Sequence, residues 1–211
     1  MSIGILGGGV WGSALARVLS KNKVIIYARD KNIVKSINEH KLNPKLKYSS
    51  FNDNVSATDE IHNLQNVEFL FVALPAQNIR EVRENAELND ENQNVVIFSK
   101  GIDISSSKFL TEVIKDTLPS KSISILSGPS FSNEVSQNLP TAFTLATNNK
   151  KNFESISNLI DNKNCRVYYS SDIIGTQIGG ALKNIYAIAA GITQGLTLGE
   201  NAKSALITRS F

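Results

Sequence analysis

Two lysines are the side chains of this sequence best suited to chemistry. Lys183 is the only charged residue between Asp172 and Glu200, in a stretch of apolar and small residues typical of a buried helix. A lysine in such surroundings is costly unless it is paired or its pKa falls, and a lysine with a lowered pKa can exchange a proton with a substrate hydroxyl. The alternative is that Lys183 lies on an exposed helix face, and the pattern alone leaves both open.

Lys100 is the second candidate. It follows the apolar run 94–99 and precedes Gly101, so we expect it at the carboxyl end of a strand, where it could hold an anionic substrate. The alternative is the exposed start of a loop. If the two lysines share one pocket, their repulsion lowers the pKa of one of them. Asn184 could orient a substrate hydroxyl, or be an ordinary polar residue of a helix.

A dinucleotide site is predicted at the start of the chain. Gly7, Gly9 and Gly12 have the spacing G-x-G-x-x-G, after the apolar run 3–6 and before a helical pattern over 13–19. In this arrangement the first glycine makes a tight turn, the second lets the backbone approach a pyrophosphate, and the third lets the helix pack closely on the strand.

The end of the second expected strand, 24–28, leaves the choice between NAD and NADP open. Arg29 and Asp30 come directly after this strand. An acidic residue here can accept hydrogen bonds from the adenosine ribose, whereas an arginine can pair with the 2′-phosphate of NADP. A surface arginine that stacks on adenine or faces solvent is the alternative for Arg29.

Alternating strand and helix patterns position these residues. Further strands are expected at 67–74, 94–99, 123–127, 141–146 and 166–169, and further helices at 30–39, 76–88, 105–118 and 150–160. The alternation predicts an α/β fold with a doubly wound, mostly parallel, Rossmann-type sheet, in a dinucleotide-binding domain over 1–170. Since such sheets bind ligands at the carboxyl ends of their strands, four segments should line one crevice. They are 7–12, 74–75, 99–101 and 127–129.

The pattern changes at Ser171, which we expect to cap a helix. The following stretch is rich in small residues, with a closely packed helix over 179–190 and another over 200–209 after Gly199. Residues 171–211 are therefore predicted to be the beginning of an all-helical substrate domain. Because a helix has only just started when the sequence reaches Phe211, we expect this domain to be truncated.

Composition limits the classes of function. The net charge of +3 comes from scattered residues and does not favour a nucleic acid partner, and no stretch is apolar enough for a bilayer span. Cys165 is the only cysteine, so an intrachain disulfide is excluded and a reducing, cytoplasmic location is expected. His40 and His62 lie in polar contexts, and no metal-ligand spacing is present.

Segments in order along the whole chain resemble the bacterial NAD(P)-dependent glycerol-3-phosphate dehydrogenases. These segments are 7–16, 99–102, 127–131, 139–142, 181–184 and 199–209. The resemblance implies hydride transfer between NAD(P)H and dihydroxyacetone phosphate. The product is sn-glycerol 3-phosphate, which feeds glycerophospholipid synthesis.

The resemblance also implies roles for individual residues. Lys183 is the proton acceptor when the substrate hydroxyl is oxidised, and the donor in the reverse direction. The substrate-contacting positions are Lys100, Gly128, Ser130, Lys183 and Asn184. The cofactor-contacting positions are Gly7, Gly9, Val10, Trp11, Gly12, Arg29, Tyr48, Lys100 and Ser132.

One departure from the family keeps other hypotheses open. A later segment of the family supplies an aspartate near the catalytic lysine and an Arg-Asn pair that grips the substrate phosphate, and this sequence ends before it. We therefore expect cofactor binding with impaired turnover. The alternatives are a catalytically impaired NAD(P)-binding module and a related hydroxy-acid dehydrogenase, although the segment 127–131 argues against the latter. The expected partner is a phosphorylated small molecule, and a homodimer is left open.

Overall fold

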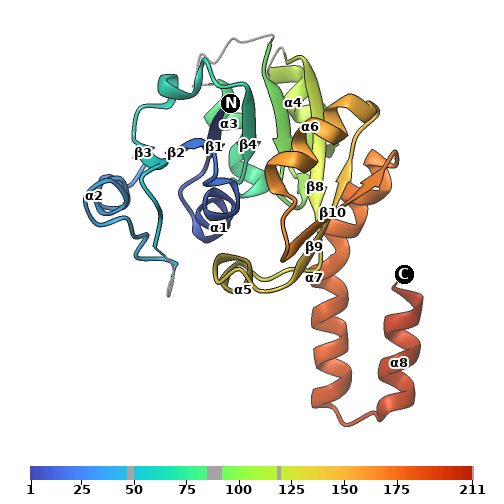
Figure 1. The fold of residues 1–211 in the computed structure, drawn as a ribbon. Coiled ribbons are helices and arrows are strands. Elements are labelled where there is room, and N and C mark those ends of the chain that lie inside the picture. The colour runs from blue at the N-terminus through green and yellow to red at the C-terminus, as the bar shows by residue number, and fades with distance from the viewer. Residues whose placement is uncertain (47–49, 85–91, 118–119, 211) are drawn as a thin grey trace.

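The protein is described by a computed structural model that covers residues 1–46, 50–84, 92–117 and 120–210 (Figure 1). Its main sheet has eight strands, which the chain enters in the order β1 (Ser2–Leu6), β2 (Lys23–Tyr27), β3 (Val55–Thr58), β4 (Phe69–Val72), β5 (Asn94–Ile97), β8 (Ser122–Ser127), β9 (Thr141–Ala146) and β10 (Cys165–Ser170). Their spatial order is β3-β2-β1-β4-β5-β8-β9-β10. Every neighbouring pair is parallel except β8 and β9. The predicted doubly wound, mostly parallel sheet is confirmed.

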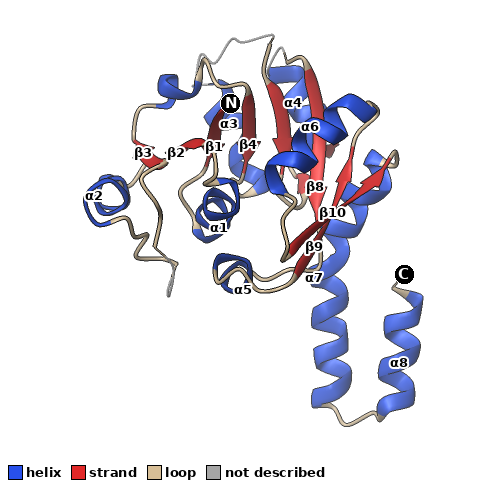
Figure 2. Cartoon of the chain, viewed as in Figure 1, coloured by secondary structure: helices blue, strands red, loops and turns tan. Residues whose placement is uncertain are grey.

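Helices cover both faces of this sheet (Figure 2). One face packs on α1 (Val10–Leu19), α2 (Lys31–His40), α5 (Ser132–Ser136) and α6 (Lys150–Ile160). The other packs on η1 (Ile61–Leu64), η2 (Ala76–Asn78), α3 (Ile79–Glu84) and α4 (Leu110–Thr117). Because side chains alternate along a strand and both faces are covered, the central strand β4 is apolar throughout. In β4, Phe69 and Phe71 join one core while Leu70 and Val72 join the other.

The chain reverses its direction of winding at β1. β1 pairs with β2 on one side and with β4 on the other, in parallel register on both. In doubly wound sheets the crevice for ligands opens at this switch point, outside the carboxyl ends of the strands. The loops that follow β1, β4 and β5 therefore lie around one opening.

Several element boundaries differ from the sequence prediction. The pattern misses β3 and a small antiparallel hairpin made of β6 (Ile102–Asp103) and β7 (Lys108–Phe109). Because the hairpin takes up these residues, the helix predicted over 105–118 begins only at Leu110. The helix predicted over 76–88 starts as η2 and continues as α3, and its last residues lie outside the described part of the chain.

Two helices follow the sheet and form a hairpin that projects from it (Figure 1). They are α7 (Ile173–Gly195) and α8 (Glu200–Arg209), and α8 has the predicted bounds. The prediction that Ser171 caps α7 is wrong by one residue. The cap is Asp172, whose carboxylate accepts a hydrogen bond of 2.7 Å from the Gly175 backbone N–H. Among the described helices, none has the length and apolarity needed to cross a bilayer.

The fold predicts an unreactive Cys165. The residue is 2% exposed, and burial, aided by the Asp161 carboxylate, raises the pKa of its thiol to about 11. Since the thiolate is the nucleophile, we expect almost no reaction with an aromatic disulfide reagent at pH 8 in the native protein and complete reaction in denaturant. Cys165→Ser, which has no thiol, gives the background signal of the assay. Fast reaction of the native protein would contradict this packing of β10.

Candidate active site

The glycine loop has a geometry that only glycine permits. β1 ends at Leu6 and α1 begins at Val10, so Gly7, Gly8 and Gly9 make the whole turn. Gly7 has a φ of +127°, and a Cβ there would lie 2.7 Å from the carbonyl oxygen of Ala73. A Cβ on Gly12 would overlap the carbonyl oxygen of Gly7. The spacing of the glycines therefore lets α1 start directly against the end of β1.

The amino end of α1 is free to bind an anion. Gly9 is the N-cap, without a side-chain hydrogen bond to the first turn, and a Cβ on Gly9 would meet no atom within 4 Å. The first N–H groups of a helix lack partners within the helix and carry a partial positive charge. The residues present thus fit the pyrophosphate of a dinucleotide.

A cleft of about 340 Å³ continues from this loop past the ends of β2 and β4. Arg29, Lys45 and Asp30 line it and are exposed, so the two cations outnumber the one carboxylate there. Asp30, the acidic residue after β2, already accepts a hydrogen bond of 2.9 Å from the Asn32 N–H as the N-cap of α2.

Aromatic packing joins the loop to the centre of the sheet. The Trp11 ring lies 5.0 Å from the Phe98 ring, and Phe98 lies 5.8 Å from Phe143, between centroids. The Lys100 Nζ lies 6.0 Å from the centroid of the Trp11 ring and donates a hydrogen bond of 3.2 Å to the Gly128 carbonyl. Lys100 therefore spans the crevice between the glycine loop and the segment after β8.

Lys183, the other lysine predicted to carry the chemistry, lies close enough to Lys100 for their charges to interact. The Lys183 Nζ lies 5.5 Å from the centroid of the Phe131 ring. Burial first, and the positive charge of Lys183 second, lower the pKa of Lys100. The effect of a neighbouring positive charge that the sequence predicts for one of the two lysines thus falls on Lys100.

Ser130 and Gly128, two of the predicted substrate contacts, follow β8. Ser130 is 5% exposed, and its buried Oγ has no hydrogen-bond partner within the described residues. A buried hydroxyl without a partner is unfavourable, so this atom is suited to a polar ligand. Gly128 packs so closely that a Cβ would lie 2.5 Å from the Ala142 carbonyl oxygen.

The contacts predicted for cofactor and substrate all stay predictions, including those of Val10, Ser132, Asn184 and Tyr48. Val10 and Ser132 are half-buried and open α1 and α5, respectively. Asn184 is exposed on α7 and makes no hydrogen bond through its side chain within the described residues. Tyr48 lies outside the described residues.

The sequence reasoning missed Asn43. This residue is 2% exposed, and its Nδ2 donates to the Gly8 carbonyl at 3.1 Å and to the Ser13 Oγ at 2.6 Å. Its Oδ1 accepts from the Lys45 N–H at 2.9 Å. Asn43 therefore supports the glycine loop from the segment after α2. In the sequence, the only sign of this supporting role is the position of Asn43 directly before Pro44.

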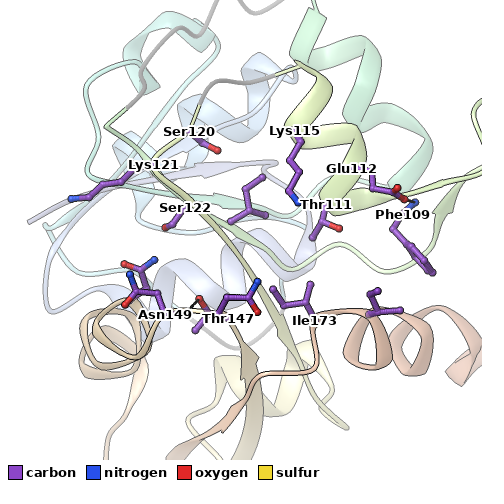
Figure 3. Close-up of a pocket in the computed structure, with 14 residues that line it drawn as sticks. Phe109, Thr111, Glu112, Lys115, Ser120, Lys121, Ser122, Thr147, Asn149 and Ile173 are labelled. Atoms are coloured by element: carbon purple, nitrogen blue, oxygen red, sulfur yellow. Dashed lines mark hydrogen bonds between the residues drawn. The ribbon is translucent and has the colours of Figure 1, made fainter.

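A larger cleft, of about 880 Å³, lies elsewhere (Figure 3). It opens between α4, the amino end of β8 and the turn from β9 to α6, with Lys115, Lys121 and Asn149 among its labelled side chains. None of the residues predicted for the site lines it. Lys100 instead links Trp11, beside the glycine loop, to the Gly128 carbonyl, so the candidate site is placed next to the glycine loop and not in the larger cleft.

The lowered pKa of Lys100 predicts a cost in stability. Below the pKa that Lys100 has in the folded state, the lysine is charged and its charge destabilises the fold. This destabilisation disappears as the pH rises towards 10.5, the ordinary pKa of a lysine. We therefore expect Lys100→Met to raise the melting temperature at pH 7, with a gain that shrinks towards pH 10. Calorimetry across this pH range measures it, with Lys35→Met, an exposed residue of α2, as control. A gain that grows with pH would contradict the account.

Comparison with known proteins matches both parts of the chain. Residues 2–153 match the N-terminal domain of NAD-dependent glycerol-3-phosphate dehydrogenase, and residues 172–211 match the C-terminal domain. Glycerol-3-phosphate dehydrogenase (NAD(P)+) of Novosphingobium aromaticivorans is 38% identical over 99% of this chain and 64% of its own length. The same enzyme of Erythrobacter litoralis is 39% identical over the same shares. This chain therefore spans less than two thirds of the length of these relatives.

A solved structure agrees with the sequence relatives. The glycerol-3-phosphate dehydrogenase of Coxiella burnetii has a TM-score of 0.90 and 35% identity, over 99% of this chain and 66% of that one. The match extends through the sheet and both projecting helices, since nearly the whole chain is covered. The chain belongs to the family of NAD-dependent glycerol-3-phosphate dehydrogenases.

Proposed function

We propose that this chain binds NADPH or NADH at the glycine loop and holds dihydroxyacetone phosphate in the crevice beside it. The reaction is reversible hydride transfer that gives sn-glycerol 3-phosphate, a precursor for glycerophospholipids, in the cytoplasm. The observation that carries the proposal is the convergence of Lys100, Lys183 and the unpartnered Ser130 hydroxyl next to the glycine cradle. The names of the relatives supply the substrate.

Each side chain has a separate task in this proposal. The bound cofactor supplies or accepts the hydride. Lys183 donates a proton to the carbonyl oxygen as the alcohol forms and takes it back in the oxidation, so charge does not accumulate on that oxygen. Lys100 and Ser130 hold the polar end of the substrate, and the Gly128 carbonyl orients Lys100 by accepting its hydrogen bond. The cofactor domain extends over 1–170 and the substrate domain begins at 171.

A cofactor-binding module with little turnover is the second candidate. Ile185, Ile188 and Ile192 on α7 are 57–64% exposed, so this helix presents an apolar face to water. Lys183 on the same helix is only half-buried, so solvent reaches its part of the site. Charge interactions between the lysines and a substrate are weaker there than in a closed site.

A product assay separates the two candidates. We expect the chain to form glycerol 3-phosphate, detected by mass spectrometry, from NADPH and dihydroxyacetone phosphate, and to leave pyruvate unreduced. Lys183→Met should lower the rate by about 10²-fold because the proton donor is lost, with NADPH affinity unchanged. NADPH binding without product would select the second candidate. Equal rates for the parent and Lys183→Met, or preferred reduction of pyruvate, would contradict the proposed reaction.

Arg29 predicts how the cofactors are distinguished. A guanidinium in the cleft beside Lys45 can pair with the 2′-phosphate that only NADPH carries. We therefore expect Arg29→Ala to weaken NADPH binding by about tenfold and to leave NADH binding unchanged, as measured by calorimetry. Lys35→Ala, an exposed cation of α2, is the matched control. Equal loss of affinity for both cofactors would reject the contact with the 2′-phosphate.

A further inference from the structure

A single polar side chain is the buried anchor of α7. Gln177 is 7% exposed, and it is the only buried residue of this 23-residue helix. The other residues of α7 are half-buried or exposed. Glutamine is mostly exposed in proteins, and its amide requires hydrogen-bond partners when it is buried.

The Gln177 amide bonds to α4 through both of its ends. Its Oε1 accepts from the Thr111 N–H at 3.2 Å, and its Nε2 donates to the Thr111 Oγ1 at 3.1 Å. Nε2 also lies 3.3 Å from the Ile173 carbonyl oxygen of its own helix. Thr111 is in the first turn of α4, where backbone N–H groups have no partner within the helix. Gln177 thus caps α4 and ties α7 to it.

Gly180 brings the next turn of α7 against the crevice. A Cβ on Gly180 would lie 3.3 Å from the Ser127 Oγ and 3.6 Å from the Lys100 Cγ. The aliphatic stem of Lys100 therefore runs alongside the backbone of α7. Lys183 comes one turn later, about 9 Å along the helix axis from Gln177.

We propose that Gln177 is a positioning residue whose bonds to Thr111 fix the rotation of α7 and so hold the Lys183 ammonium beside Lys100. Apolar contacts are non-directional, and most of α7 is not buried, so they leave the rotation of the helix weakly defined. A pair of hydrogen bonds to one residue defines it, because both distance and direction are constrained. This inference rests on the proposed function, since only that function gives the two lysines their roles in catalysis.

The test titrates Lys100 in the 211-residue chain without cofactor or substrate. Reductive ¹³C-methylation and NMR give the pKa of each lysine, and Lys100→Arg assigns the signal. We expect Lys183→Met to raise the Lys100 pKa, because a neighbouring positive charge is removed. Gln177→Met should also raise the Lys100 pKa. The same substitution should raise it by less in a Lys183→Met background, because both changes act on the interaction between the two lysines.

Controls separate positioning from general stability. Gln194→Leu replaces an exposed glutamine of the same helix and should leave the Lys100 pKa unchanged. Thr111→Val keeps the backbone N–H and removes one of the two bonds, so it serves in place of Gln177→Met if that variant fails to fold. Thr111→Ser retains the hydroxyl and should restore the parent titration.

Three results would overturn the inference. The first is an unchanged Lys100 pKa in Gln177→Met despite a lower melting temperature. The second is a Lys100 pKa shift from Gln177→Met that is equally large with and without Lys183. The third is an unchanged Lys100 pKa in Lys183→Met. Because the titration requires no turnover, a failed product assay does not affect its outcome. An unchanged titration, in turn, would leave the proposed reaction intact.

Discussion

The contact between Gly12 and the carbonyl of Gly7 is the constraint on which the site depends. With no side chain between them, α1 begins against the end of β1 and its amino end points into the opening at the switch of the sheet. This position brings Trp11 onto Phe98 and places Lys100 across from it. A larger residue at 12 would move α1 and therefore both the anion cradle and the wall of the crevice.

Charge repulsion is the second organising feature. Lys100 and Lys183 come from different structural units, a strand end and a projecting helix, and their charges lie close enough for one to lower the pKa of the other. Like charges held together destabilise a fold, and such arrangements persist where an anionic ligand or proton transfer requires them. The buried Ser130 hydroxyl, which has no hydrogen-bond partner within the described residues, is a further locally unfavourable feature near the two lysines.

Local patterns in the sequence were sufficient for the glycine loop and for every strand of the main sheet except β3. The G-x-G-x-x-G spacing and the apolar runs of β1, β2 and β4 act over a few residues, so their structure follows from composition and period. The roles of Asn43 and Gln177 were not predicted because their hydrogen-bond partners are distant in the chain. Gln177, for example, bonds to a residue 66 positions away. The β6–β7 hairpin was missed because its strands have two residues each and show no alternation.

The claim that the dinucleotide lies on the glycine loop is tested most directly by the fluorescence of Trp11. Trp11 is the only tryptophan in the chain and lies in the first turn of α1. The account predicts saturable quenching of its emission by NADPH, with energy transfer to the reduced nicotinamide. Both should be lost in Gly12→Val, because the added side chain collides with the Gly7 carbonyl and displaces α1 with its anion cradle. Unchanged emission at an NADPH concentration where calorimetry shows binding, or equal quenching in Gly12→Val, would contradict it.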